Sequence, residues 1–141
     1  MSVETVTNAV LKEVQRWYPD SILDRDNRVM VSSHHGAAYV DIGEHSPGEG
    51  DVFYIAQVWA HIAFDVERTP ELFEWLAVSG SDFLLGHVVL EEGEDGYAVA
   101  LFRNRLDITN SLDALGSSVA AVIESAHELG SEFEDRGFGL L

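Results

Sequence analysis

The side chains best suited to metal or acid–base chemistry in this 141-residue chain are its six histidines, because it contains no cysteine. His34 and His35 are adjacent, and on a strand they would point to opposite faces and could not bind one ion together. His61 and Asp65 lie four residues apart, which on a strand separates them by roughly 13 Å. No H-E-x-x-H pair occurs in the sequence. We therefore expect no metal site and no bound cofactor.

The carboxylates are numerous but form no recognisable catalytic or ion-binding motif. With 25 Asp and Glu residues, pairs at a suitable spacing for glycoside hydrolysis arise by chance. The acidic run 91–95 lacks the alternating ligands and the closing glutamate of an EF-hand loop. A nucleophile elbow, a P-loop and a dinucleotide-binding fingerprint are also absent. We therefore predict that the protein is not an enzyme.

The net charge narrows the classes of partner. Eight Lys and Arg residues against 25 Asp and Glu give −17 at pH 7. A field of this sign repels phosphate backbones and anionic lipid, which argues against nucleic-acid and membrane binding. The N-terminal residues resemble no signal peptide, and no apolar stretch reaches the ~20 residues of a membrane span. Together with the absence of cysteine, these features lead us to expect a cytoplasmic protein.

The sequence predicts three helices. Apolar residues at three- and four-residue spacing predict helices over about 3–18, 70–79 and 111–130. Ser2 and Thr69 are the expected N-caps of the first two. The tail 131–141 is rich in acidic residues and is expected to fray.

Strands fill most of the remaining chain. Residues 43–51 mix Pro, Gly and acidic side chains and are predicted to form a loop. The element order α-β-β-β-α-β-β-α predicts a single α+β domain over 1–141, with the helices packed on one side of a curved, mostly antiparallel sheet. The predicted strands are 29–31, 37–42, 52–66, 83–90 and 97–103.

The stretch 52–66 carries the clearest pattern, because every even-numbered residue in it is apolar or aromatic. This period of two predicts a strand with one fully buried face. Its fifteen residues would span roughly 50 Å, whereas a compact chain of this size has a diameter of roughly 37 Å. The strand must therefore bend, end early or project from the domain, and we expect a strongly curved sheet.

The odd-numbered residues of the same stretch pose the main functional question. Phe53, Ile55 and Trp59 are too apolar to face open water. Either the first and last helices cover this face as well, so that both faces are core, or the face is an exposed groove. An exposed groove would bind a partner chain by docking or by strand addition.

One basic pair, Arg103 and Arg105, occurs in the later half of the chain. Arginines at the end of a strand are commonly solvated. Alternatively, the pair orients an acidic residue such as Glu124 or Glu128 across a dimer.

The element order and the stretch from Thr69 to Gly130 resemble the type III secretion chaperone-like fold, in particular its YbjN-type branch. The family-like segments are T-P-E-L-F-E-W-L, R-N-R-L-D-I-T and S-L-D-A-L, the last of which opens the final helix. The resemblance implies a non-enzymatic domain, often a homodimer, that holds an extended client segment on apolar patches. The corresponding residues would be Phe53, Ile55 and Trp59 on the sheet and Val3, Val6 and Val10 on the first helix.

The residues and the resemblance together predict a homodimer that binds a partner polypeptide as a chaperone or regulator. Two alternatives stay open. One is an acidic antitoxin or immunity protein that blocks a basic toxin. The other is a small-ligand-binding α+β domain with a cavity between sheet and helices.

Overall fold

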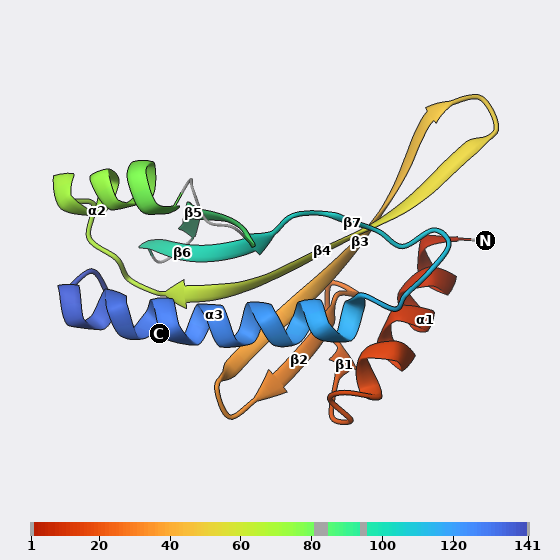
Figure 1. Ribbon diagram of the computed structural model, residues 1–141, viewed down its shortest axis with the longest axis horizontal. Coiled ribbons are helices and arrows are strands. Elements are labelled where there is room, and N and C mark those ends of the chain that lie inside the picture. Colours follow the sequence, from red (N-terminus) through yellow and green to blue (C-terminus); the bar gives the residue numbers. More distant parts are fainter. Residues whose placement is uncertain (1, 81–84, 94–95, 141) are drawn as a thin grey trace.

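The computed structural model describes residues 2–80, 85–93 and 96–140 and shows an α+β fold that combines helices with an antiparallel sheet (Figure 1). The described elements are α1 (Val3–Gln15), β1 (Ile22–Leu23), β2 (Val29–Ser33), β3 (Gly36–Gly48), β4 (Asp51–Ala63), α2 (Pro70–Trp75), the π-helical turn η1 (Leu76–Gly80), β5 (Gly86–Gly93), β6 (Gly96–Arg103), β7 (Leu106–Asp107) and α3 (Leu115–Arg136).

The strand order across the sheet is β1-β2-β3-β4-β6-β5, with β7 paired to β4. The predicted α+β class and order of the main elements are confirmed. The sequence pattern missed β1 and β7, which have only two residues each and are too short to show alternation. Residues 83–84 of a predicted strand and residues 94–95 of a predicted turn lie outside the described residues.

The first two helices begin where the sequence predicts, each after a capping side chain. The Ser2 hydroxyl accepts a hydrogen bond from the Thr5 N–H at 3.2 Å, and the Thr69 hydroxyl accepts one from the Leu72 N–H at 3.2 Å. Each cap satisfies one of the N–H groups that the first helical turn leaves unpaired. The second helix then widens into the π-helical turn η1, which includes Gly80, one residue beyond the predicted end.

The third helix differs from its prediction at both ends. It begins at Leu115 and not near Ser111, and it continues to Arg136 instead of ending at Gly130. The C-cap is Gly137, whose φ of 72° is the left-handed conformation that glycine adopts without strain.

The segment that was expected to fray packs back onto the core. Phe133 is fully buried, with its ring edge-to-face against those of Trp75 and Phe138. Near the chain end, the Phe64 N–H donates a hydrogen bond to the Leu140 carbonyl at 2.7 Å. The acidic residues of this segment indicate a solvated tail, but only Glu134 and Asp135 are exposed. Glu132 accepts a hydrogen bond from the Trp75 indole N–H at 3.4 Å, and Phe133 and Phe138 pack on the core.

The strands β3 and β4 form a long hairpin that projects beyond the rest of the molecule (Figure 1). The loop predicted over 43–51 is wrong, because only Glu49 and Gly50 separate the two strands. Residues 43–52 are all exposed, so this part of the hairpin buries neither face and its sequence shows no alternation. Pro47 is tolerated because the register shifts there, between His45 and Gly48. We call residues 43–53 the arm.

The alternation predicted for 52–66 is confirmed along most of β4. Its even-numbered residues from Tyr54 to Ile62 are at most 5% exposed and belong to the main core. The strand ends early, at Ala63, so that Phe64, which the pattern placed inside, is 44% exposed. The long strand thus both ends early and projects from the domain in the arm.

All the helices pack on the even-numbered face of β4. The helix α3 contacts β3, β4 and β6, while α1 contacts β2 and β3 and η1 contacts β5. The possibility that the first and last helices cover the odd-numbered face is therefore wrong. We call this odd-numbered side of the sheet the helix-free face.

Candidate functional site

Four aromatic side chains cross the helix-free face, one each from β3, β4, β6 and β5. In register, Tyr39 lies opposite Trp59, and Trp59 lies opposite Phe102. Phe102 in turn lies opposite His87 on the edge strand. The successive ring centroids are 4.5, 5.6 and 5.9 Å apart, with interplanar angles of 22°, 19° and 16°. These residues therefore stack side by side, and we call them the aromatic row.

The geometry of the aromatic row decides what it can bind. Because its rings are nearly parallel from strand to strand, their planes stand upright on the sheet and their edges point outward. Trp59 is only 7% exposed, yet it lies outside the main core and is covered by its neighbours in the row. Proteins that stack nucleic-acid bases need open ring faces. Ring edges carry partial positive charge, so the row favours electron-rich groups such as carbonyl or carboxylate oxygens.

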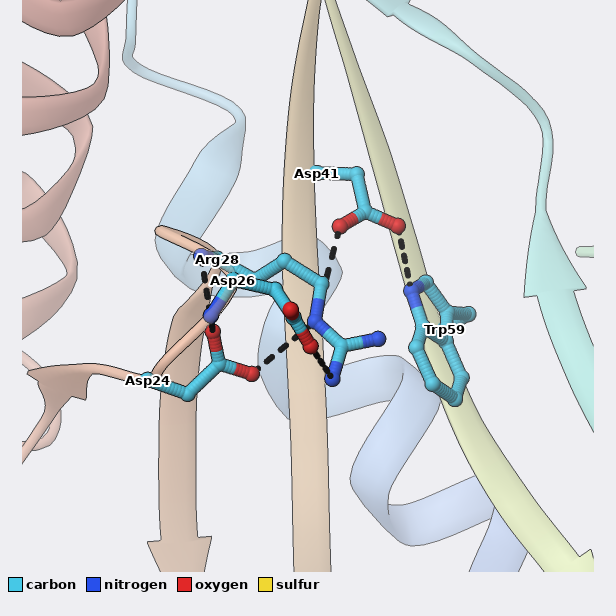
Figure 2. A network of polar contacts seen from close by, with 5 residues as sticks. All are labelled: Asp24, Asp26, Arg28, Asp41 and Trp59. Atoms are coloured by element: carbon cyan, nitrogen blue, oxygen red, sulfur yellow. Dashed lines mark hydrogen bonds and ion pairs between the residues drawn. The ribbon is translucent and has the colours of Figure 1, made fainter.

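A charged network around Arg28 closes one end of the row (Figure 2). The guanidinium carbon lies 4.9 Å from the ring centroid of Tyr39 and 5.4 Å from that of Trp59. The Nε–H of Arg28 donates to Asp24 Oδ2 at 2.9 Å, and its Nη2 lies 3.5 Å from Asp26 Oδ2. The cation therefore covers the open side of the first rings while two carboxylates hold it in place.

Asp41 joins this network to the aromatic row. Its Oδ2 accepts a hydrogen bond from the Trp59 indole N–H at 2.8 Å, and its Oδ1 lies 4.0 Å from the Nε of Arg28 (Figure 2). A buried indole N–H needs an acceptor, and this one also fixes the angle of the ring. Trp59 is therefore held by stacking on both sides and by one polar bond.

Both charges at the centre of the network are stabilised. Burial alone would raise the pKa of Asp24, but hydrogen bonds from the backbone and guanidinium of Arg28 and from the Asp26 N–H outweigh it and lower the pKa. Partial burial similarly opposes the charge of Arg28, but its bond to Asp24 and the nearby carboxylates raise the pKa overall. This end of the row consequently stays ionised at neutral pH.

His61 and Glu91 lie beside the row. The His61 ring meets Trp59 edge-on at 5.1 Å, and its Nε2 lies 3.9 Å from Glu91 Oε2. Burial, aided by the charge of Arg28, lowers the pKa of His61, and burial raises the pKa of Glu91. Both shifts favour the neutral forms, so desolvation outweighs a contact that is long for an ion pair.

Two shallow grooves flank Gln57 on the helix-free face. The arm-side groove, of about 570 Å³, is lined by Ile55 and by β3 residues from Asp41 to His45. The β5-side groove, of about 500 Å³, is lined by Phe102 and by residues of β5. Gln57 and Arg105 line both grooves. The two grooves thus adjoin, and an extended segment is long enough to occupy both.

Arg105, which lines both grooves, and Arg103, which lines the β5-side groove, have no carboxylate within ion-pair distance among residues 2–80, 85–93 and 96–140. Arg103 Nη1 donates to the Asn104 carbonyl at 3.0 Å, and Arg105 Nε donates to Gln57 Oε1 at 3.2 Å. The Nε of Arg103 is buried and has no partner in the described structure. A buried donor left unpaired costs about 1–3 kcal/mol, which is unexpected in a chain so rich in acceptors.

Of the sheet residues predicted to bind a partner, all lie on the helix-free face. Ile55 and Phe53 are half-buried, at the arm-side groove and on the arm, while Trp59 is buried within the aromatic row. Trp59 therefore orders the neighbouring side chains of the face and offers little surface for contact with a partner.

The predicted helix residues do not join this site. Val6 and Val10 are 5% and 0% exposed and belong to the core beneath α1, and Val3 packs against it. Val6 and Val10 therefore offer no surface to a partner in this structure, because the spacing that builds the helix buries them against the sheet, whereas Val3 is half-buried. Within the described chain, no ion pair joins Arg103 or Arg105 to Glu124 or Glu128.

The histidines also lie differently from their prediction. His34 and His35 form the turn between β2 and β3, so they are not on opposite faces of a strand. Their ring centroids are 4.6 Å apart, and the His35 ring lies 4.5 Å from that of His127 on α3. Among the residues that the structure describes, no group of three or more His, Asp or Glu side chains is placed to hold a metal ion.

Sequence reasoning missed Tyr39, Phe102 and His87 as neighbours of Trp59. Their alternation with core residues placed them on one face of each strand, but which residues stand opposite one another depends on register. Arg28 and Gln57 were missed because both act across strand boundaries and neither belongs to a local motif.

Comparisons of the chain with models of protein families, with curated proteins and with solved structures find no match. In the described part of the chain, no helix combines the length and the apolar character needed to cross a membrane.

Proposed function

We propose that this protein binds an extended segment of a partner polypeptide on its helix-free face, as a non-enzymatic chaperone or regulator. The observation that carries the proposal is the one-sided packing of the helices. It leaves Ile55, Val89 and Phe102 half-buried around two open grooves, on a face that no element of the described chain covers. Half-buried apolar residues around a groove are typical of a surface that a partner completes.

Backbone pairing is available at the same place. The strand β3 pairs with β2 only as far as Val40, so from Asp41 onward its outer edge has no strand neighbour in the described structure. An incoming extended segment can add to such an edge with main-chain hydrogen bonds. Pro47 has no N–H, which limits this pairing to the part of β3 before it. The free edge 41–46 also borders the arm-side groove, so pairing and side-chain docking would act together.

The resemblance to the chaperone-like family supports the same mode of binding, since those domains hold extended client segments. A homodimer and a cytoplasmic location complete this proposal. The −17 charge keeps the free protein soluble and attracts segments of net positive charge.

Site-specific crosslinking tests the proposal. A photoreactive amino acid replaces Ile55 or Val89 on the helix-free face, or Glu128 on the exposed side of α3 as the matched control. After irradiation in extract of the native organism, we expect positions 55 and 89 to capture segments of the same polypeptide and position 128 to capture none. Equal capture from all three positions, or none from 55 and 89, would refute the proposal. Self-crosslinks alone would assign the face to the dimer interface instead.

A further inference from the structure

Four of the seven arginines have a carboxylate or an aromatic ring as a partner in the described chain, whereas Arg25, on an exposed turn, and Arg103 and Arg105 have neither. Arg16, Arg28 and Arg136 each lie within 4.0 Å of a carboxylate oxygen, and Arg68 stacks over the Tyr97 ring at 4.4 Å. In a protein with 25 acidic residues and eight basic ones, such matching is the expected outcome. Arginines without such a partner on a grooved face therefore require an explanation.

Arg105, which lines both grooves, and Arg103, which lines the β5-side groove, have no such partner. A guanidinium carries five N–H donors, and each of these two uses one within the described structure. The carboxylates that line the same grooves, those of Asp41, Glu44 and Glu91, form no ion pair with either arginine in the described structure. Asp41 is bonded within the Arg28 network, and Glu91 is directed toward His61.

Gln57 holds the pair in position. Its Oε1 accepts the Nε–H of Arg105, and its amide nitrogen donates to the backbone carbonyl of Arg103. Gln57 thereby fixes the guanidinium of Arg105 and the backbone of Arg103 to the middle of β4. The terminal nitrogens of Arg105 have no partner in the described structure, and they form the fork that binds a carboxylate with two parallel hydrogen bonds.

We infer that Arg103 and Arg105 form a carboxylate-recognition site, which binds an aspartate or glutamate side chain of the polypeptide segment held on the helix-free face. This inference depends on the proposed function and names one feature of its ligand. The outward ring edges of the neighbouring aromatic row favour the same electron-rich group.

The carboxylate comes from a side chain and not from a chain terminus. The grooves continue on both sides of Gln57 and Arg105, which line each of them. A segment that occupies both grooves therefore has chain on either side of the arginines. The −17 field attracts a segment of net positive charge, while the arginine pair reads one acidic residue within it and sets its register.

Three designed peptides test this inference against the full-length protein. The first is acetylated and amidated and alternates valine with lysine or threonine, with one glutamate at its centre on the valine side. The second replaces that glutamate with glutamine, and the third has the glutamine centre with a free C-terminal carboxylate. Binding is followed by NMR, through the methyl signals of Ile55 and Val89 and the Nε–H signals of Arg103 and Arg105.

We expect the glutamate peptide to bind about tenfold more tightly than the glutamine peptide, because a paired charge adds at least one strong hydrogen bond. Both peptides should shift the Ile55 and Val89 methyl signals, whereas only the glutamate peptide should shift the arginine signals. Arg105→Gln should abolish the tenfold preference. Arg25→Gln removes the same charge from an exposed turn and should keep it.

The outcomes separate this inference from the proposed function. Methyl shifts with equal affinity for the glutamate and glutamine peptides would overturn the carboxylate site and leave the binding face intact. Tightest binding of the peptide with a free C-terminus would overturn the side-chain assignment. An absence of methyl shifts with every peptide would count against both proposals.

Discussion

The two faces of β4 bury their side chains by different means. On the even-numbered face, Ile62 is fully buried in a core closed by a helix on the far side. On the helix-free face, Trp59 is also nearly buried, but its cover is Tyr39 and Phe102 from the adjacent strands, with Arg28 beyond them. The helices cover the even-numbered face as a second layer. On the helix-free face, side chains of the sheet itself provide the only cover in the described structure.

This difference explains why one face serves stability and the other suits binding. A second layer excludes water from every direction, so the core beneath the helices contains almost only apolar residues. Stacking within the sheet layer shields the ring faces from water but leaves the outward ring edges exposed. Residues beyond the last ring of the aromatic row receive no such shielding. Ile55 lies beyond the row, half-buried at the arm-side groove, where a bound segment would supply the missing layer.

Two isoleucines of the same strand give the sharpest test of this difference between the two faces. Ile62→Ala should lower the free energy of unfolding by about 2–5 kcal/mol, because it leaves a cavity in a closed core. Ile55→Ala should lower it by less than about 1 kcal/mol, because the shortened side chain leaves only a wider groove. Urea titration of both variants measures the difference. Equal losses would show that the helix-free face is as tightly closed as the core.

Trp59 gives the next largest effect and tests burial within the layer. We expect Trp59→Ala to cost about 2–3 kcal/mol, less than its size suggests, because water can enter from the open side. Trp59→Phe keeps an aromatic ring in the row but loses the bond to Asp41, and should cost about 1 kcal/mol. Urea titration measures both losses. If Trp59→Phe were as damaging as Trp59→Ala, the polar bond and not the stacking would hold the row.

The even-numbered face could be predicted from the sequence because it depends on a local pattern. From Tyr54 to Ile62 every second residue is buried. An apolar period of two over this length is typical of a strand and does not fit a helix. Which side the helices cover could not be predicted, because Phe53, Ile55 and Trp59 made the opposite face look equally apolar. The choice between them depends on how the chain crosses the sheet, and local spacing carries no such information.

The arm and the aromatic row escaped prediction for related reasons. Residues 43–52 of the arm bury neither face, so their Pro, Gly and acidic side chains are typical of a loop, although they also suit a solvated strand pair. The row exists only once four strands are in register, since Tyr39 and His87 are far apart in the chain and separated by two strands in the sheet. The end of α3 was misplaced because Phe133 follows several polar residues and its burial depends on Trp75.

The smallest expected effect sharpens the comparison through pH, because His61 sits at the open rim of the helix-free face. Burial, aided by Arg28, lowers the pKa of folded His61 below the ordinary value of 6.5. As the pH falls through 6.5, the unfolded chain therefore takes up a proton on this residue before the folded chain does. Stability is full above 6.5 and is lost as the pH falls toward the folded-state pKa.

The variant His61→Gln should remove this contribution, so its free energy of unfolding should fall less between pH 7 and pH 5.5 than that of the unmodified protein. The raised pKa of Glu91 acts in the opposite direction and nearer its ordinary value of 4.5, and both proteins retain it. Urea titrations at matched pH values give the difference between the two proteins. Parallel pH profiles would show that His61 is as well solvated in the folded chain as in the unfolded one. The aromatic row would then shield only its own rings from solvent. Trp59 would be buried and His61 would be solvated.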